Sequence, residues 1–112
     1  MLKTTRYCYV CDLKNDPALI AEYKAYHKAV WPEIIQSIKN AGVLDMEIYL
    51  HSNRLCMVME VGNDFDANQK AKLDAENPKV QEWETLMWKY QQALPTAEPG
   101  QKWVPMERIF KL

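Results

Sequence analysis

The stretch YKAYHKAVWPE, residues 23–33, determines how the chain folds on either side of it. It places Tyr23 and His27 four residues apart, and on a helix such residues share one face, one turn apart. Pro32 disfavours helical backbone at Trp31 and is well suited to the first position of a new helix. The stretch therefore predicts a helix, a corner and a second helix, with a tyrosine and a histidine projecting into the same space.

His27 is the candidate proton carrier of this stretch. Histidine is the side chain that titrates nearest physiological pH, so it can both accept and donate a proton there. The other interpretation is structural, because a lone histidine on a half-apolar helix face more often serves packing than catalysis. Spacing alone leaves both interpretations open.

The residues before this stretch predict a strand and the start of the first helix. Arg6 to Leu13 is rich in Tyr, Cys and Val, which favour strands. Asp16 followed by Pro17 is a good helix start, since the aspartate caps free N–H groups and the proline fixes a helical φ. The first helix is expected to run to about Val30.

The residues after it predict a second helix and a β-hairpin. The helix begins at Pro32 and ends at Gly42, a residue type suited to helix termination. Leu44 to Leu50 alternates apolar and polar residues, and Leu55 to Val61 follows a Ser-Asn turn, so the two read as antiparallel strands. The helix carries apolar residues at core spacing: Ile34, Ile35 and Ile38.

The rest of the chain predicts a second helical region split by a proline. Asp64 is the expected cap of a helix over Phe65 to about Ala75, and Asn77-Pro78 breaks and restarts it. The restarted helix carries one apolar stripe: Val80, Trp83, Met87 and Tyr90.

The C-terminal part predicts a loop and a last strand. Pro95 to Lys102 contains two prolines and a glycine, which is typical of a loop. Trp103 to Phe110 is expected to be a strand, with Pro105 restricting it to a sheet edge or a strand start.

The element order β-α-β-β-α-β is the ferredoxin-like pattern, an α+β fold in which helices cover one face of an antiparallel sheet. One domain over residues 1–112 is expected. The opposite sheet face is expected to be too apolar for water, and a second subunit in a two-fold homodimer is its expected cover. The alternative is that the terminal strand or loop folds over it. The residues assigned to this face are Tyr7, Tyr9, Tyr49, Cys56 and Val58.

Composition excludes several classes of function. Of 112 residues, 48% are hydrophobic and 26% charged, which is ordinary for a globular protein, and the net charge of −1 argues against nucleic-acid binding. No apolar run approaches the ~20 residues of a membrane span. The N-terminus lacks a signal-peptide pattern, so a cytoplasmic location is expected.

The cysteines do not form a recognisable redox or metal site. Cys8 and Cys11 spell C-x-x-C, but within a strand residues three apart point to opposite faces. With Cys56 the count is three, which argues against a disulfide framework. No clustered His and Cys set predicts zinc, so no metal and no cofactor is expected.

The remaining candidate is a polar and aromatic pocket. Tyr23 and His27 would enter it from the first helix, and Trp83 with Glu84 from the last. Aromatic rings stack on the C–H faces of sugars, while polar groups fix the hydroxyls. The alternative for Trp83 is a plain core residue.

The chain resembles the L-rhamnose mutarotase family over nearly its whole length. The resemblance rests on Tyr23…His27…Trp31-Pro32-Glu33, then MEIY at 46–49, VQEW at 80–83, and the ending Met106…Ile109-Phe110. It implies a ferredoxin-like dimeric α+β barrel fold. It also implies interconversion of the α and β anomers of a 6-deoxy-L-hexose by acid–base ring opening, without metal or organic cofactor.

The same resemblance implies site residues. The family's proton-donating histidine corresponds to His27, a substrate-contacting tyrosine to Tyr23, and a pocket tryptophan to Trp83. Two positions depart from the pattern: Met46 stands where a strand tyrosine contacts substrate, and Glu84 replaces the second residue of a Trp-Trp pair. Both are expected substrate-contacting positions.

The two departures bear on the identity of the sugar. They leave L-rhamnose as the expected substrate and L-fucose as the alternative. A different class of protein, a non-enzymatic or heme-binding or other small-molecule-binding dimeric α+β barrel domain, shares the fold and remains the competing hypothesis.

Overall fold

The structure, a computed structural model, describes residues 3–112. Its antiparallel sheet has the strand order β2-β3-β1-β4, with β5 also paired to β1. β1 pairs with β3 along one edge, so the short strands β4 and β5 share its other edge. The strands are β1 (Thr5–Leu13), β2 (Val43–His51), β3 (Arg54–Val61), β4 (Gln91–Gln92) and β5 (Val104–Pro105).

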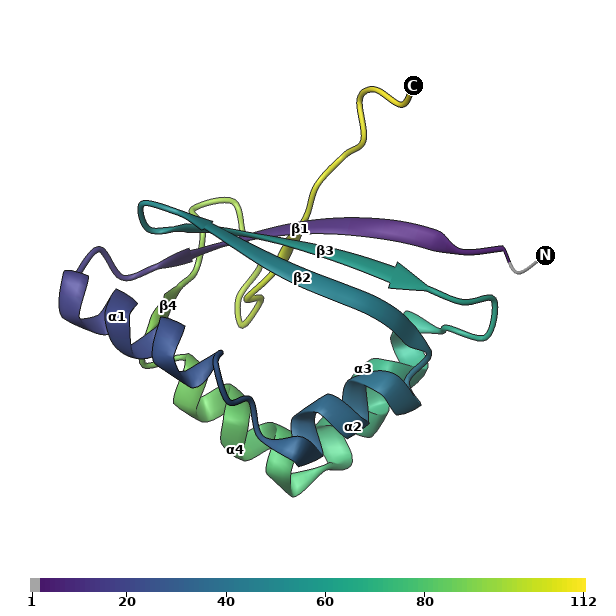
Figure 1. Ribbon diagram of the computed structural model, residues 1–112, viewed down its shortest axis with the longest axis horizontal. Helices are drawn as coiled ribbons and strands as arrows, with labels where there is room; N and C mark the ends of the chain where they lie inside the picture. The colour runs from purple at the N-terminus through teal and green to yellow at the C-terminus, as the bar shows by residue number, and fades with distance from the viewer. Residues whose placement is uncertain (1–2) are drawn as a thin grey trace.

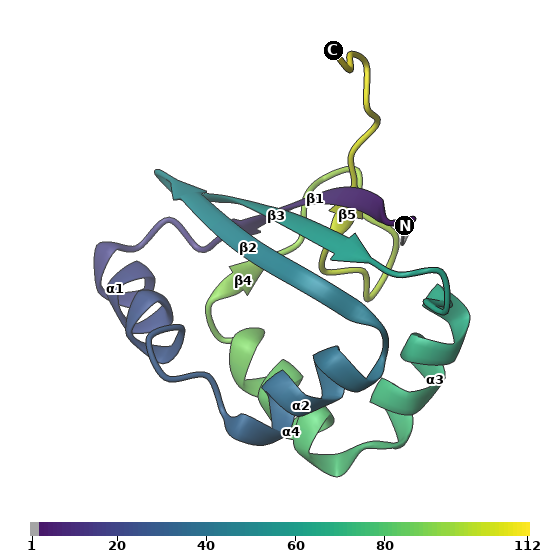
Figure 2. The ribbon, with the colours of Figure 1, turned by 45° about the vertical axis from the view of Figure 1, so that its right-hand side comes forward.

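All helices of residues 3–112 lie on one face of this sheet, and the chain after β5 projects away from the opposite side (Figure 1). The turned view shows the helices beneath the sheet as well (Figure 2). This confirms the ferredoxin-like α+β fold. None of the helices in these residues is long and apolar enough to span a bilayer. The helices are α1 (Pro17–Tyr26), α2 (Pro32–Asn40), α3 (Ala67–Glu76) and α4 (Pro78–Met87).

The corner between α1 and α2 forms as the proline predicts, but α1 ends at Tyr26 and not near Val30. Trp31 precedes Pro32 and is extended, with φ −56° and ψ 135°, so the helix must unwind before it. The backbone N–H groups of Lys28 and Ala29 accordingly bond to carbonyls three residues back. His27 is thereby the C-cap residue of α1.

The strand register corrects the assignment of Tyr7 and Tyr9 to the helix-free sheet face. Cys11 and Leu13 share their side of β1 and are almost fully buried beneath the helices, with 0% and 1% exposure. The Tyr7 ring lies 6.3 Å from that of Phe65, also on the helix side. Strand alternation cannot identify a face when both sets are apolar. The helix-free face instead carries Cys8, Val10, Tyr49, Cys56 and Val58.

The cap of α3 also differs from the prediction. Asp66, and not Asp64, accepts hydrogen bonds from the backbone N–H groups of the helix start. The chain first makes a turn in which the N–H of Phe65 donates to the carbonyl of Gly62, at 3.2 Å. This turn packs Phe65 against a buried cluster on the sheet. It also lies against Gly42, which ends the α2 segment with φ +98°, as expected of its glycine.

The expected last strand, Trp103 to Phe110, is wrong for most of its length. Only Val104 and Pro105 pair with β1. Pro105 has no N–H with which to continue the ladder, so regular pairing stops there. After a hydrogen bond from the N–H of Met106 to the carbonyl of Cys8, at 2.8 Å, the chain leaves the sheet.

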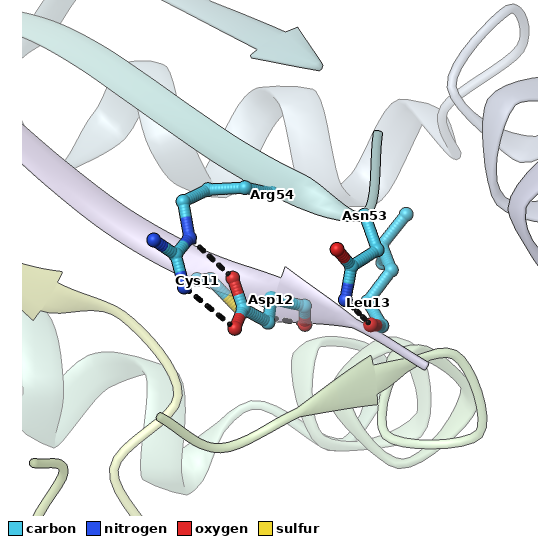
Figure 3. Close-up of polar contacts among 5 residues, drawn as sticks. All are labelled: Cys11, Asp12, Leu13, Asn53 and Arg54. Carbon is cyan, nitrogen blue, oxygen red and sulfur yellow. Dashed lines mark hydrogen bonds and ion pairs between the residues drawn. The ribbon is translucent and has the colours of Figure 1, made fainter. Parts of the chain in front are cut away.

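Side-chain hydrogen bonds connect the end of β1 to the hairpin turn between β2 and β3 (Figure 3). The Arg54 guanidinium donates to both carboxylate oxygens of Asp12, at 2.8 and 3.1 Å. The Asn53 side chain donates to the carbonyl of Leu13, at 3.0 Å. These contacts fix the register of β1 where β4 joins it.

The core lies between the sheet and the helices. Val80, Trp83, Met87 and Tyr90, the predicted stripe of α4 and the residues after it, are all buried there. Cys11 belongs to the same cluster, and burial raises the pKa of its thiol to about 11. Cys8 lies on the opposite sheet face, so the C-x-x-C pair is split by the sheet as predicted.

Candidate active site

A cavity of about 770 Å³ lies between the sheet and the helices. This volume falls within the range of small-molecule sites, roughly 300–1,000 Å³. Side chains from every helix and from strands β1 to β4 line it. The five residues singled out from the sequence are all in its wall: Tyr23, His27, Met46, Trp83 and Glu84.

Tyr23 and His27 enter the cavity from the end of α1. Their rings lie 4.2 Å apart between centroids, as the four-residue spacing predicts. The Nδ1–H of His27 donates to the backbone carbonyl of Tyr23, at 2.8 Å. Because a carbonyl can only accept, this contact assigns the proton of a neutral imidazole to Nδ1 and leaves Nε2 as its basic atom.

The surroundings favour the neutral form of His27. Burial lowers the pKa of His27 from its usual value of 6.5, and the hydrogen bond to the Tyr23 carbonyl opposes this in part. The imidazole is therefore neutral near pH 7 and able to accept a proton at Nε2. These are the properties of a general base.

Tyr23 supplies a buried hydroxyl group beside His27. Its side chain is 3% exposed, and burial raises the pKa of its hydroxyl well above the usual range, although a hydrogen bond from Gln91 lowers it. The Gln91 Nε2 lies 3.3 Å from the Tyr23 hydroxyl oxygen. The hydroxyl consequently keeps its proton at any physiological pH.

Trp83 combines the two roles that the sequence left open. Its side chain is 8% exposed and belongs to the core, and it also lines the cavity. Aromatic neighbours hold it edge-on, with centroid distances of 5.7 Å to His27 and 5.0 Å to Trp31. The indole is thus a rigid wall beside the histidine.

Met46 and Glu84 enter from opposite sides of the cavity. Met46 is on the helix-facing side of β2, opposite the buried Met59. Glu84 is on α4, and its backbone carbonyl accepts a hydrogen bond from the Lys102 Nζ, at 3.1 Å. Burial lowers the pKa of Lys102 from its usual 10.5, while the Glu84 charge opposes that shift.

The cavity therefore contains a neutral histidine base beside a tyrosine hydroxyl and a tryptophan face. Residues 6–112 match the sequence-family model for L-rhamnose mutarotase. The chain belongs to the L-rhamnose mutarotase family. Its activity is accordingly of the mutarotase type, an isomerisation of carbohydrates, as the resemblance in the sequence implied.

Individual members of the L-rhamnose mutarotase family extend this match. The chain is 49% identical over 109 residues to an L-fucose mutarotase of Xanthomonas campestris pv. campestris, covering 96% of this chain and 87% of that protein. It is 30% identical over 104 residues to an L-rhamnose mutarotase of Rhizobium meliloti, covering 93% and 96%. The crystal structure of an L-rhamnose mutarotase from Formosa agariphila has the same fold, with a TM-score of 0.72, 24% identity and 96% and 98% coverage.

Several polar residues of the cavity wall in this mutarotase-family chain are absent from the sequence-based site, among them Gln91 and Lys102. Gln91 follows α4 on β4, and Lys102 lies in the loop before β5. No local pattern indicated Lys102, since a lysine in a loop is normally exposed. The pairing of a buried glutamine with Tyr23 depends on a contact between residues 68 apart. Among residues 3–112 no group of three His, Cys, Asp or Glu side chains is arranged to hold a metal ion.

Proposed function

We propose that this protein is an L-fucose mutarotase that exchanges the α and β anomers of the sugar. The single observation that carries the choice of sugar is the 49% identity to an L-fucose mutarotase over 96% of the chain, against 30% to an L-rhamnose mutarotase of similar coverage. Met46 and Glu84, which depart from the rhamnose pattern, both line the cavity. L-Rhamnose is the second candidate, because the family model bears its name. Family membership favours either enzyme over a non-enzymatic domain.

The proposed mechanism uses His27 as the proton carrier. The neutral imidazole accepts the proton of the anomeric hydroxyl at Nε2 while the bond between C1 and the ring oxygen breaks. The imidazolium so formed gives the proton to the ring oxygen, which yields the open aldehyde with its new hydroxyl. Rotation about the C1–C2 bond and the reverse transfers close the ring from the other face. Tyr23 and Trp83 support this by donating to a hydroxyl and by stacking on the ring.

Saturation transfer between the anomeric proton signals tests the proposal. With the wild-type protein, L-fucose is expected to exchange faster than L-rhamnose at equal concentration. Faster exchange of L-rhamnose would reverse the choice of sugar, and no acceleration of either above the buffer rate would refute the mutarotase proposal. D-Glucose, which carries a 6-hydroxyl, is the control sugar.

The pH dependence of exchange follows from the state of His27. Because burial lowers the pKa of His27 below 6.5, protonation of the base should reduce kcat/KM along an acid limb whose midpoint lies below pH 6.5. The unfolded chain binds this proton more readily than the folded chain does. The folding stability that the neutral His27 contributes is therefore present above pH 6.5 and is lost as the pH falls through the lowered pKa of the folded chain. The measurement is kcat/KM after subtraction of the buffer rate. His51→Gln should leave the limb unchanged, and a limb midpoint above pH 6.5 would contradict the neutral-base role.

Trp83→Phe should raise the KM for sugar about fivefold, the equivalent of about 1 kcal/mol for one lost polar contact. It should also lower Tm, since the indole packs in the core. Trp31→Phe is the matched control, because Trp31 packs against Trp83 but does not line the cavity. An unchanged KM for Trp83→Phe with a lowered Tm would show that Trp83 serves only the core.

The assembly proposed for this enzyme is a homodimer through the helix-free sheet face. That face carries half-buried Cys8, Val10, Cys56 and Val58 and exposed Tyr49. The segment after β5 adds Ile109 and Phe110, which are 90% and 75% exposed. A second copy of the chain would cover both sets. A cytoplasmic location is proposed on the basis of the sequence pattern alone.

A further inference from the structure

Gln91 occupies a core position on the helix side of the sheet. It pairs with Leu13 across the β1–β4 ladder, and paired residues of adjacent strands point to the same face. Leu13 faces the helices and is 1% exposed, and Gln91 is 3% exposed in the wall of the cavity. The neighbouring Gln92 pairs with Asp12 and is exposed. The two glutamines therefore have the same chemistry in opposite environments.

The hydrogen bonds of Gln91 are incomplete. Its Nε2 donates to the Tyr23 hydroxyl at 3.3 Å, while its Oε1 is fully shielded and has no hydrogen-bond partner among residues 3–112. One strong hydrogen-bonding group of this buried side chain is therefore unused.

The unpaired carbonyl end of the Gln91 amide costs folding free energy. The N–H end has a structural role, because it supplies the side-chain hydrogen bond of the buried Tyr23 hydroxyl. The strand pairing of β4 does not use the amide, because the ladder uses backbone atoms. The carbonyl end of the glutamine is therefore the part that the folded chain leaves without a function.

The bond to Gln91 also sets the direction of the Tyr23 proton. The hydroxyl oxygen accepts from the amide, so its own proton must point toward another acceptor. Among residues 3–112, this hydroxyl has one side-chain hydrogen bond, the one from Gln91. Both residues line the same cavity, and the pair has one free donor, on Tyr23, and one unpaired acceptor, the Gln91 Oε1, which is shielded from solvent in this orientation.

We propose that Gln91 and Tyr23 together bind a single sugar hydroxyl. A hydroxyl both accepts and donates, so it matches the pair: the Tyr23 O–H donates to its oxygen, and the Gln91 carbonyl accepts its proton. This requires rotation about the terminal torsion of Gln91, which is soft, so that Oε1 takes the place of Nε2 beside the Tyr23 hydroxyl and the Nε2 bond to Tyr23 is exchanged for the contacts with the sugar hydroxyl. The proposal rests on the proposed sugar substrate. It makes Gln91 a substrate-binding residue that also positions the Tyr23 hydroxyl beside His27.

Gln91→Met, with Gln92→Met as its matched control, tests the proposal. Methionine keeps the length and volume of glutamine and removes the amide. We expect the KM for L-fucose to rise about tenfold, with kcat changed less than about threefold, since the lost contact serves ground and transition states alike. Tm should change little, because removal of the unpaired Oε1 offsets the loss of the Nε2 bond to the Tyr23 hydroxyl. Gln92→Met should alter neither quantity. A lowered Tm with an unchanged KM would overturn the proposal.

A double-mutant cycle separates a shared site from two independent effects. If both residues hold one hydroxyl, Gln91→Met should change KM less than about threefold in a Tyr23→Phe background. Equal effects in both backgrounds would overturn the shared hydroxyl. Deoxy analogues of L-fucose extend the test: the analogue that lacks the bound hydroxyl should bind equally to wild type and Gln91→Met. Equal discrimination by both proteins against every analogue would count against Gln91.

The readout distinguishes this inference from the proposed function. If the wild type accelerates no anomer exchange, the mutarotase proposal fails, and the same comparisons are then made on the Kd of L-fucose from an NMR titration. If the wild type exchanges normally and Gln91→Met matches it in KM, only the Gln91 inference fails. If the wild type neither exchanges nor binds L-fucose, both fail.

Discussion

His27→Asn is expected to reduce catalysed anomer exchange by about 10²–10⁴-fold, the usual contribution of a positioned acid–base group. Asparagine can still donate its side-chain N–H to the Tyr23 carbonyl, which the His27 Nδ1–H does at 2.8 Å. It lacks the basic Nε2 that would carry the proton between the anomeric hydroxyl and the ring oxygen. The change therefore removes the chemistry and retains the local hydrogen bond that helps cap α1.

The fold should survive this substitution, because His27 is the C-cap residue of α1 and only half-buried. His27→Ala should lose as much exchange and more stability, since it also removes the side-chain bond. His51→Gln is the matched control: the chain has two histidines, and His51 is exposed at the end of β2. Saturation transfer gives the rates, and a thermal melt gives the stability. Exchange by His27→Asn within about threefold of wild type would remove His27 from the mechanism.

Val58→Lys is expected to convert a homodimer into monomers, which halves the mass measured by sedimentation or light scattering. Val58 lies on the helix-free sheet face between its ladder partners Cys8 and Glu47. A lysine there would bring a charge into the centre of the proposed interface, where the cost of taking it and the neighbouring Glu47 out of water exceeds what their pairing returns. In a monomer the same side chain would extend into water, so folding should be nearly unaffected.

Leu73→Lys is the matched control for this change. Leu73 is an exposed leucine, 45% accessible, on α3 and thus on the other side of the molecule. It should leave the mass at that of the wild type. Deletion of residues 107–112 should weaken the same dimer, because the apolar side chains of this segment are exposed in the single chain. A wild-type mass of one chain at micromolar concentration would refute the dimer itself, and a Val58→Lys dimer would refute this face as its interface.

The elements of this protein were predictable because their signals are local. Pro17, Pro32 and Asn77-Pro78 start helices, Gly42 ends one, and the alternation after it makes a strand. Each signal depends on the φ and ψ angles that a few adjacent residue types favour, so it can be recognised from the local sequence. The spacing of Tyr23 and His27 is of the same kind, since four residues on a helix fix two side chains relative to each other.

The errors of prediction arise where contacts with other segments decide the outcome. Tyr7 and Tyr9 alternate with Cys8 and Val10, so both faces of β1 are apolar, and the packing of the helices decides which face is buried. The last strand is short because the chain leaves the edge of β1 after Pro105, and the composition of residues 103–110 does not show where it leaves. Which face of β1 is buried is likewise not a property of the strand itself.

The candidate site divides in the same way. The sequence determined the histidine, the tyrosine and the tryptophan, through helical spacing and through resemblance to a family. Only the tertiary structure decided that Gln91 donates to Tyr23 across 68 residues, that Lys102 reaches α4 from a loop, and that burial keeps His27 neutral. The physical reason is that hydrogen bonding and desolvation depend on which groups the fold brings together, and local periodicity contains no information on contacts between distant segments.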